Sequence, residues 1–195
     1  KFEHDACGIG FTANIDATRS HQIIEDGVQM LINLEHRGAV GGDASTGDGA
    51  GLQFEIPHDF FQKEISSFEL PAEEDYAAGM VFLPNNQTII DHCQDQFEEI
   101  AIQEGSEVLG WRQVPTNNNC LQGIAADSEP IIHQVFLHRK NINKEDFERK
   151  LYVIRRQIEK NVKNYIEELG IETDAIFYIN SLSYRTIVYK GLLTG

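Results

Sequence analysis

The sequence has few cysteines and no long apolar run, and each shortage excludes a class of protein. Three cysteines among 195 residues, with no Cys-x-x-Cys pair, do not resemble the disulfide framework of a small secreted domain. No apolar stretch approaches the roughly 20 residues that cross a bilayer, and no signal-peptide segment is visible. These shortages predict a cytoplasmic protein with no membrane partner.

Basic residues are also scarce. Sixteen Lys and Arg residues against thirty-one Asp and Glu residues give a formal net charge of −15. Nucleic acids and anionic membranes are bound through basic patches, so this charge argues against both as partners. The hydrophobic share of 41% excludes a disordered or collagen-like chain. A chain of this length can bury one sizeable core, which predicts a single domain.

Hydrophobic periodicity predicts helices alternating with strands along most of the chain. Helices are expected after the N-cap Ser20 and over 58–65, 86–105 and 143–169. Strands are expected over 8–15, 51–56, 76–84, 107–115, 131–139, 175–182 and 185–193. The last two are expected to be joined by a short turn at Ser183 and Tyr184. Tight strand connections between long helices predict an α+β fold with a largely antiparallel sheet.

Residues 35–51 form a glycine-rich segment that invites three familiar interpretations, and all three fail. The segment holds six glycines and almost no large apolar residue, which predicts a long turning loop. A phosphate loop needs a lysine where Asp48 follows Gly47. A calcium loop needs a glycine at Asp48 and a glutamate at Phe54. A dinucleotide-binding loop needs a different glycine spacing and a following helix.

The histidines and remaining cysteines do not predict a metal site. His133 and His138 are five residues apart on a predicted strand, so their side chains point to opposite faces. His92 and Cys93 are neighbours on a predicted helix and also diverge. Cys93 and Cys120 are expected to be ordinary buried or half-buried thiols.

Two elements carry candidate chemistry. Cys7 lies between the small residues Ala6 and Gly8 at the start of a predicted strand, where a substrate could reach the thiol. Arg37 and Gly38 lie where a helix enters the glycine-rich loop, and an arginine can bind a carboxylate through two hydrogen bonds. From the residues alone, a packing cysteine and a structural arginine remain open alternatives.

Five segments, in order between about residue 3 and residue 192, resemble a known family. They are "ACGIGF", "LEHRGAVGGDASTGDGAG", "GWRQVP", "FERKLYVIRRQIEK" and "FYINSLSYRTIVYKG". They resemble the class II glutamine amidotransferase domain that begins glutamate synthase large subunits. The resemblance implies an N-terminal-nucleophile fold, a four-layer αββα sandwich, here expected to be truncated at its C-terminal side.

The resemblance also implies a chemistry. Cys7 would attack the side-chain amide of glutamine, release ammonia and leave a thioester for water to hydrolyse. Arg37 and Gly38 would line the glutamine site, while Asp43 and Asp48 would order the loop. The family passes the ammonia to 2-oxoglutarate to form glutamate. This use of ammonia implies later synthase domains with a flavin and an iron–sulfur cluster, and a small reductase subunit as a further partner. No cofactor or metal is expected in this chain, and the electron donor, pyridine nucleotide or ferredoxin, stays open.

The position of Cys7 predicts an unprocessed form. In this family the α-amino group of the nucleophile is the general base. A free α-amine has a pKa of about 7.7–8.0 and a thiol about 8.5, so the proton transfer is nearly balanced. While Ala6 is bonded to Cys7 that amine is an amide, and His36 is the weaker candidate for a substitute base. Residues 1–6 are therefore expected to be a residual propeptide, and 7–195 the N-terminal part of the domain.

The chain also departs from the family pattern. The pattern calls for an Asn-Gly pair in the oxyanion hole, a further Arg for the glutamine carboxylate and an Asp for its ammonium, and no Asn-Gly occurs here. Losing one oxyanion donor costs about 10²–10³-fold in rate. The chain as it stands is therefore expected to be inactive.

Two rival interpretations remain. The first is another class II amidotransferase, of the phosphoribosyl-transfer or asparagine-forming kind. It is disfavoured because those enzymes lack the helix sequence of residues 147–160 and a glycine-rich loop of this form. A non-catalytic domain of the same fold, used for regulation or assembly, is the other alternative. The presence of Cys7, Arg37 and Gly38 argues against it.

Overall fold

A computed structural model of the chain describes residues 8–34, 49–119, 121, 126–171 and 177–191. The chain divides into two compact units. One unit consists of Lys1–Phe54, Asn117–Ser128 and Val188–Gly195, and the other of Glu55–Thr116 and Glu129–Ile187.

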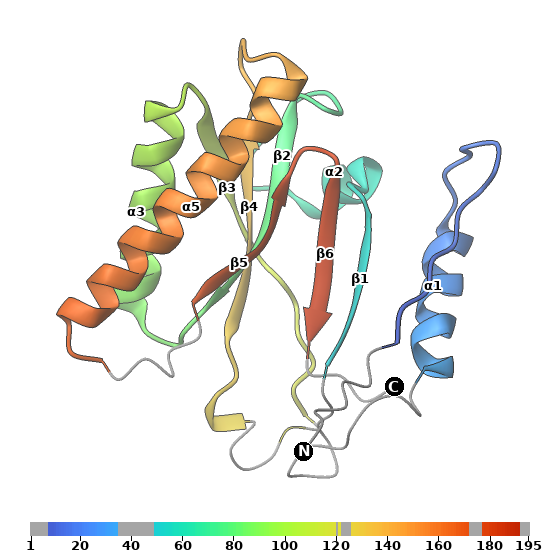
Figure 1. Cartoon of the computed structure of the whole chain (residues 1–195), viewed down its shortest axis with the longest axis horizontal. Helices are drawn as coiled ribbons and strands as arrows, with labels where there is room; N and C mark the ends of the chain where they lie inside the picture. Colours follow the sequence, from blue (N-terminus) through green and yellow to red (C-terminus); the bar gives the residue numbers. More distant parts are fainter. Residues whose placement is uncertain (1–7, 35–48, 120, 122–125, 172–176, 192–195) are drawn as a thin grey trace, which may run out of the picture. The chain divides into compact units, whose positions relative to one another are not determined.

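The larger unit is built on a four-stranded antiparallel sheet (Figure 1). Its strands are β2 (Tyr76–Leu83), β3 (Glu107–Gln113), β4 (Ile131–His138) and β5 (Tyr178–Ser183), in the order β3-β4-β2-β5. All eight residues of β2 are buried, which explains why its sequence is a continuous apolar run. Gly79, in the middle of β2, lies opposite both Val135 and Leu182.

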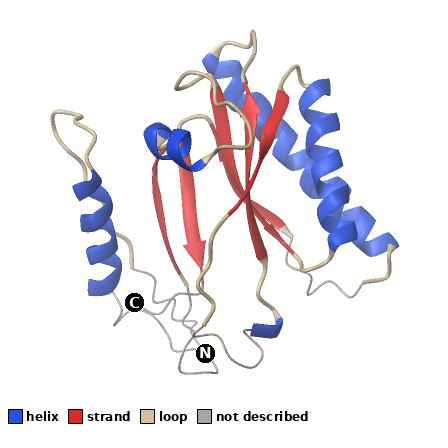
Figure 2. Ribbon diagram, turned by 180° about the vertical axis from the view of Figure 1, so that it is seen from behind, coloured by secondary structure: helices blue, strands red, loops and turns tan. Residues whose placement is uncertain are grey.

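Two long helices, α3 (Gln87–Gln103) and α5 (Lys144–Glu168), lie side by side over one face of this sheet (Figures 1 and 2). Each begins at an asparagine N-cap whose side chain accepts a backbone N–H, Asn86 for α3 and Asn143 for α5. The inward stripe of α5 recurs every three or four residues and is buried: Phe147, Leu151, Ile154, Ile158, Val162 and Ile166.

The opposite face of the sheet packs against the short helix α2 (His58–Glu64) through aromatic rings. Phe61 of α2 meets Phe136 of β4 edge to face, with ring centroids 5.0 Å apart. Tyr76 and Phe68 also lie against Phe136, at 6.1 Å and 5.5 Å. Because side chains alternate along a strand, Phe136 points to α2 while its neighbours Val135 and Leu137 belong to the core under α3 and α5.

The smaller unit contains α1 (His21–Asn33) and most of a two-stranded sheet, formed by β1 (Ala50–Glu55) and β6 (Thr186–Gly191). Ser20 is the N-cap of α1, as expected. Gly27 is the buried residue of α1, and a Cβ there would lie 3.0 Å from Leu52 Cδ2. The helix therefore approaches β1 closely at this glycine.

One expectation about local structure is wrong, and a second is off by one residue. Residues 8–15 alternate as a strand would, but the structure shows neither strand nor helix there. Ile9, Phe11 and Ile15 are almost fully exposed, and no described strand lies beside them to accept the backbone hydrogen bonds. The expected turn at Ser183 and Tyr184 also differs, because β5 runs through Ser183 and a bend follows at 184–185.

The class of fold is confirmed as α+β with antiparallel strands. The other expected helices and strands are present, apart from the parts of 175–182 and 185–193 that lie outside the described residues. In the described part of the chain, no helix combines the length and apolarity needed to cross a membrane.

Candidate functional site

The candidate catalytic and binding residues lie outside the described part of the chain. They are Cys7, Arg37 and Gly38; the loop acids Asp43 and Asp48, the weaker base candidate His36, and Cys120, which is expected to be an ordinary thiol, also lie outside it. Their roles stay predictions. The described residues nearest in sequence to Cys7 and to Arg37 are Gly8 and Leu34.

Gly8 and Leu34 lie against one another. A Cβ at Gly8 would be 2.9 Å from Leu34 Cδ2, and a Cβ at Gly10 would be 2.9 Å from Met30 Sδ. This segment can therefore follow the C-terminal half of α1 so closely because two of its residues have no side chain. Gly8 directly follows Cys7, and Leu34 precedes Arg37 by three residues. Sequence reasoning missed this contact, although the Gly-x-Gly spacing was its signal.

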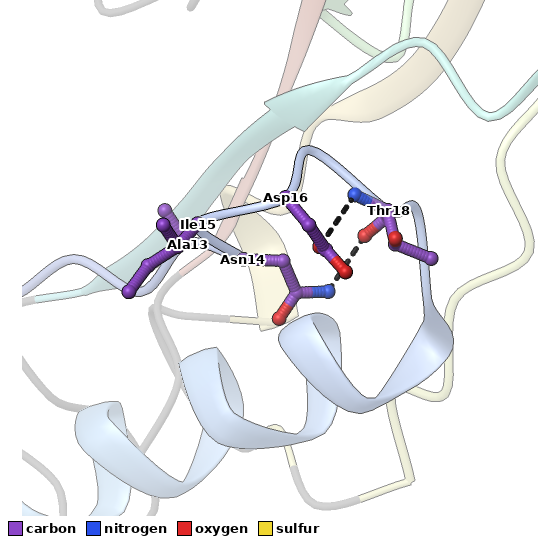
Figure 3. Close-up of a pocket in the computed structure, with 5 residues that line it drawn as sticks. All are labelled: Ala13, Asn14, Ile15, Asp16 and Thr18. Atoms are coloured by element: carbon purple, nitrogen blue, oxygen red, sulfur yellow. Dashed lines mark hydrogen bonds between the residues drawn. The ribbon is translucent and has the colours of Figure 1, made fainter.

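A shallow pocket lies a few residues further on, lined by Ala13, Asn14, Ile15, Asp16 and Thr18 (Figure 3). Asn14 Nδ2 donates to the carbonyl oxygen of Thr18 at 2.6 Å, and the Thr18 N–H donates to Asp16 Oδ1 at 3.0 Å. The backbone hydrogen bond from Thr18 lowers the pKa of Asp16 below its usual value. These polar groups stabilise the turn itself, so the pocket has the character of a local loop structure.

Arg112 forms a network in the larger unit that links β3, β4 and α2. Its Nη1 donates to Gln134 Oε1 at 3.0 Å and its Nη2 to Glu64 Oε2 at 3.1 Å. The guanidinium also lies 5.6 Å from the centroid of the Phe60 ring. Gln134 is completely buried. The arrangement satisfies a buried amide and ties α2 to the sheet, so Arg112 has a structural role that sequence reasoning did not identify.

His133 and His138 lie on opposite faces of the sheet, as predicted. His133 lies opposite Val81, whereas His138 lies opposite Tyr76, and these partners belong to opposite faces of the sheet. His138 Nδ1 is 3.1 Å from Glu107 Oε1. Among the described residues, no group of three or more His, Cys, Asp or Glu side chains could hold a metal ion.

Cys93 is confirmed as a buried thiol. Its side chain lies in the core under α3 and α5, and burial raises its pKa well above the usual range. A thiol that stays protonated is a poor nucleophile. Cys93 is therefore not a candidate for the chemistry that the sequence predicts for Cys7.

Comparison with known proteins decides the family. The model for class-II glutamine amidotransferases matches residues 7–195. The chain belongs to the class II glutamine amidotransferases. The match to the amidotransferase family begins at Cys7, and it covers all the described elements.

The amidotransferase chain is also similar to parts of several glutamate synthases. It is 44% identical to the glutamate synthase [NADPH] large chain of Bacillus subtilis, over 100% of this chain and 12% of that one. It is 40% identical to ferredoxin-dependent glutamate synthase 1 of Arabidopsis thaliana, over 98% and 12%. It is 38% identical to the glutamate synthase [NADH] of Saccharomyces cerevisiae, over 99% and 9%. The chain thus spans about a tenth of the length of these relatives.

Proposed function

We propose that this domain releases ammonia from glutamine, with Cys7 as the nucleophile. The observation that carries the proposal is the family match, which begins at Cys7. The thiolate attacks the side-chain amide carbon, the carbon–nitrogen bond breaks, and ammonia leaves after taking up a proton. Water then cleaves the γ-glutamyl thioester, giving glutamate and the free thiol.

In this proposal Arg37 and Gly38 line the glutamine site. The contact between Gly8 and Leu34 supports this, because it joins the two chain segments that lead to Cys7 and to Arg37. A planar guanidinium suits polar groups of an amino acid substrate, and a glycine allows close approach to the backbone. The four-layer arrangement of the N-terminal-nucleophile fold is part of the same proposal.

The proton-accepting group is proposed to be the α-amine of Cys7. That amine exists only after the bond between Ala6 and Cys7 is cleaved, so residues 1–6 act as a propeptide. Before cleavage the nitrogen is an amide without basicity, and the thiol stays largely protonated. Cleavage would therefore switch the domain on.

The wider setting follows from the relatives. We propose that the ammonia is used to convert 2-oxoglutarate to glutamate in other domains of a longer glutamate synthase, which would hold the flavin and the iron–sulfur cluster. The similar proteins are named for NADPH, NADH or ferredoxin, so the electron donor stays open. A small reductase subunit and a cytoplasmic location belong to the same proposal.

The test is ammonia release from glutamine by the polypeptide at its natural length. Three forms are compared: one that starts at Cys7, one that verifiably retains residues 1–6, and a Cys7→Ser form with the same start as the first. We expect activity in the first form alone, with circular dichroism showing all three folded. Activity in the Cys7→Ser form would refute the proposed role of Cys7 as the nucleophile. A folded, inactive form starting at Cys7 would favour a regulatory or assembly role for the fold.

A further inference from the structure

The outward face of α3 is acidic. Asp91, Asp95, Glu98 and Ile102 follow one another three or four residues apart, which places them on one side of the helix. All four are exposed, Ile102 at 67%, and α3 contains no lysine or arginine. We call these four residues the α3 stripe.

Part of the outward face of α5 carries the opposite charge. Tyr152, Arg156, Lys160 and Lys163 also recur every three or four residues, and all four are exposed, Tyr152 at 64%. We call them the α5 stripe. Arg156 and Lys163 reach Glu159 and Glu167 on their own helix. Lys160 has no carboxylate within salt-bridge distance among the described residues.

The two stripes lie on neighbouring, antiparallel helices. Asn161 Nδ2 donates to Gln96 Oε1 at 2.6 Å, and the rings of His92 and Tyr165 stack with centroids 3.8 Å apart. Near the other end, Lys150 Nζ is 3.1 Å from Glu104 Oε2. The N-terminal end of α3 therefore lies beside the C-terminal end of α5, as Figure 1 also shows.

This arrangement makes the surface complementary to itself. Consider a two-fold axis that lies in the plane of this surface, between the two helices and parallel to them. Rotation about this axis leaves the position of each residue along the helix direction unchanged. It sets α3 of one copy over α5 of the other. Glu98 then faces the level of Arg156 and Lys160, and Asp91 the level of Lys163. At the far end, Ile102 of one copy faces the apolar ring of Tyr152 in the other.

We propose that the α3 and α5 stripes form an interface between two copies of this protein. Each stripe covers twelve residues and extends about 16 Å along its helix. The apolar residues of the two copies can therefore meet at one end while the charged residues meet along the rest. Two-fold symmetry repeats the contact twice and closes the assembly. A nucleic acid or an anionic membrane attracted by the α5 stripe would be repelled by the α3 stripe beside it. A second copy satisfies both charges.

The first test is zero-length cross-linking of the natural-length polypeptide. Unlabelled and ¹⁵N-labelled copies are mixed in high salt, returned to low salt and treated with a carbodiimide, which joins amines to adjacent carboxylates. We expect cross-linked peptides of mixed isotope composition that join Lys160 or Lys163 to Asp91, Asp95 or Glu98. The pair Lys150 and Glu104 is the internal control, because it should couple within one copy. Coupling of the control pair without any mixed product from Lys160 or Lys163 would overturn the proposal.

The second test exchanges the charges. One double variant reverses the charges on α3, Asp95→Lys with Glu98→Lys, and the other reverses those on α5, Arg156→Glu with Lys160→Glu. When all copies in the sample carry the same double variant, we expect no cross-linked product of mixed isotope composition. Mixing the two variant populations should restore a product between the copies, now joining the lysines introduced on α3 of one variant to the glutamates introduced on α5 of the other. Failure of the mixture, with both variants folded, would contradict the pairing. Coupling to carboxylates outside the α3 stripe would identify a different partner for α5 and also contradict it.

Discussion

At the scale of single residues, His133 shows how burial sets a chemical property. Among the described residues, its buried Nδ1 has no hydrogen-bond partner, and neither has Nε1 of Trp111, whose ring lies 6.2 Å from that of His133. Val81 and Gln113 lie opposite it on the neighbouring strands. Desolvation lowers the pKa of His133, since the charged form loses its hydration.

Because the pKa of His133 is lowered by folding, acid should destabilise the folded chain. The unfolded chain takes up a proton at His133 near pH 6.5, before the folded chain does, so stability is full above that pH and falls as the pH drops through the folded pKa. Replacing His133→Phe should reduce the slope of unfolding free energy against pH between about 7 and 5. Urea titrations across this range measure the slope, with His21→Gln as the control for loss of an exposed histidine. An unchanged slope in His133→Phe would contradict the assignment.

At the scale of the elements, the N-cap residues of α5 and α1 differ in whether their side chains form a capping hydrogen bond. Asn143 Oδ1 accepts the N–H of Asp146 at 2.9 Å, whereas Ser20 at the start of α1 makes no side-chain capping bond. We expect Asn143→Ala to lower the unfolding free energy by about 1 kcal/mol. Ser20→Ala should change it by only a few tenths, because no bond is lost. Thermal or urea unfolding compares the two, and an equal effect would refute the distinction.

The elements also show what the sequence could predict. Helices α3 and α5 followed from apolar periodicity and strand β2 from its apolar run, because those signals are local. Residues 8–15 have the alternation of a strand, but a strand also needs a neighbour to complete its hydrogen bonds. Likewise the short link between β5 and β6 does not decide their pairing, because β5 pairs with β2 and β6 with β1. Pairing partners depend on residues distant in sequence.

For the candidate site too, local features could be predicted from the sequence, whereas contacts between distant segments could not. Its residue types and spacing were enough to predict roles for Cys7 and Arg37 through a family resemblance, and the family itself is confirmed. The contact of Gly8 with Leu34, the structural use of Arg112 and the stripes on α3 and α5 depend on which elements pack together. None of these could be read from one segment alone.

At the scale of the whole molecule, the proposed chemistry predicts a pH profile. In the form that starts at Cys7, the base is an α-amine with an ordinary pKa of about 7.7–8.0. Glutamine hydrolysis, measured as kcat/KM, should therefore rise with pH and level off once the amine is unprotonated. The form that retains residues 1–6 should show no such rise. A plateau already reached at pH 6 would exclude the free amine as the base.

The buried strand β2 has a consequence for how the protein is made. "YAAGMVFL" is uncharged and free of proline, the composition of segments that aggregate when exposed. During synthesis it emerges well before its pairing partners β4, from Ile131, and β5, from Tyr178. Three consecutive acids, Glu73, Glu74 and Asp75, precede it and Pro84 follows it. We expect these flanks to act as gatekeepers that keep the nascent chain from self-association until strands β4 and β5 have been made.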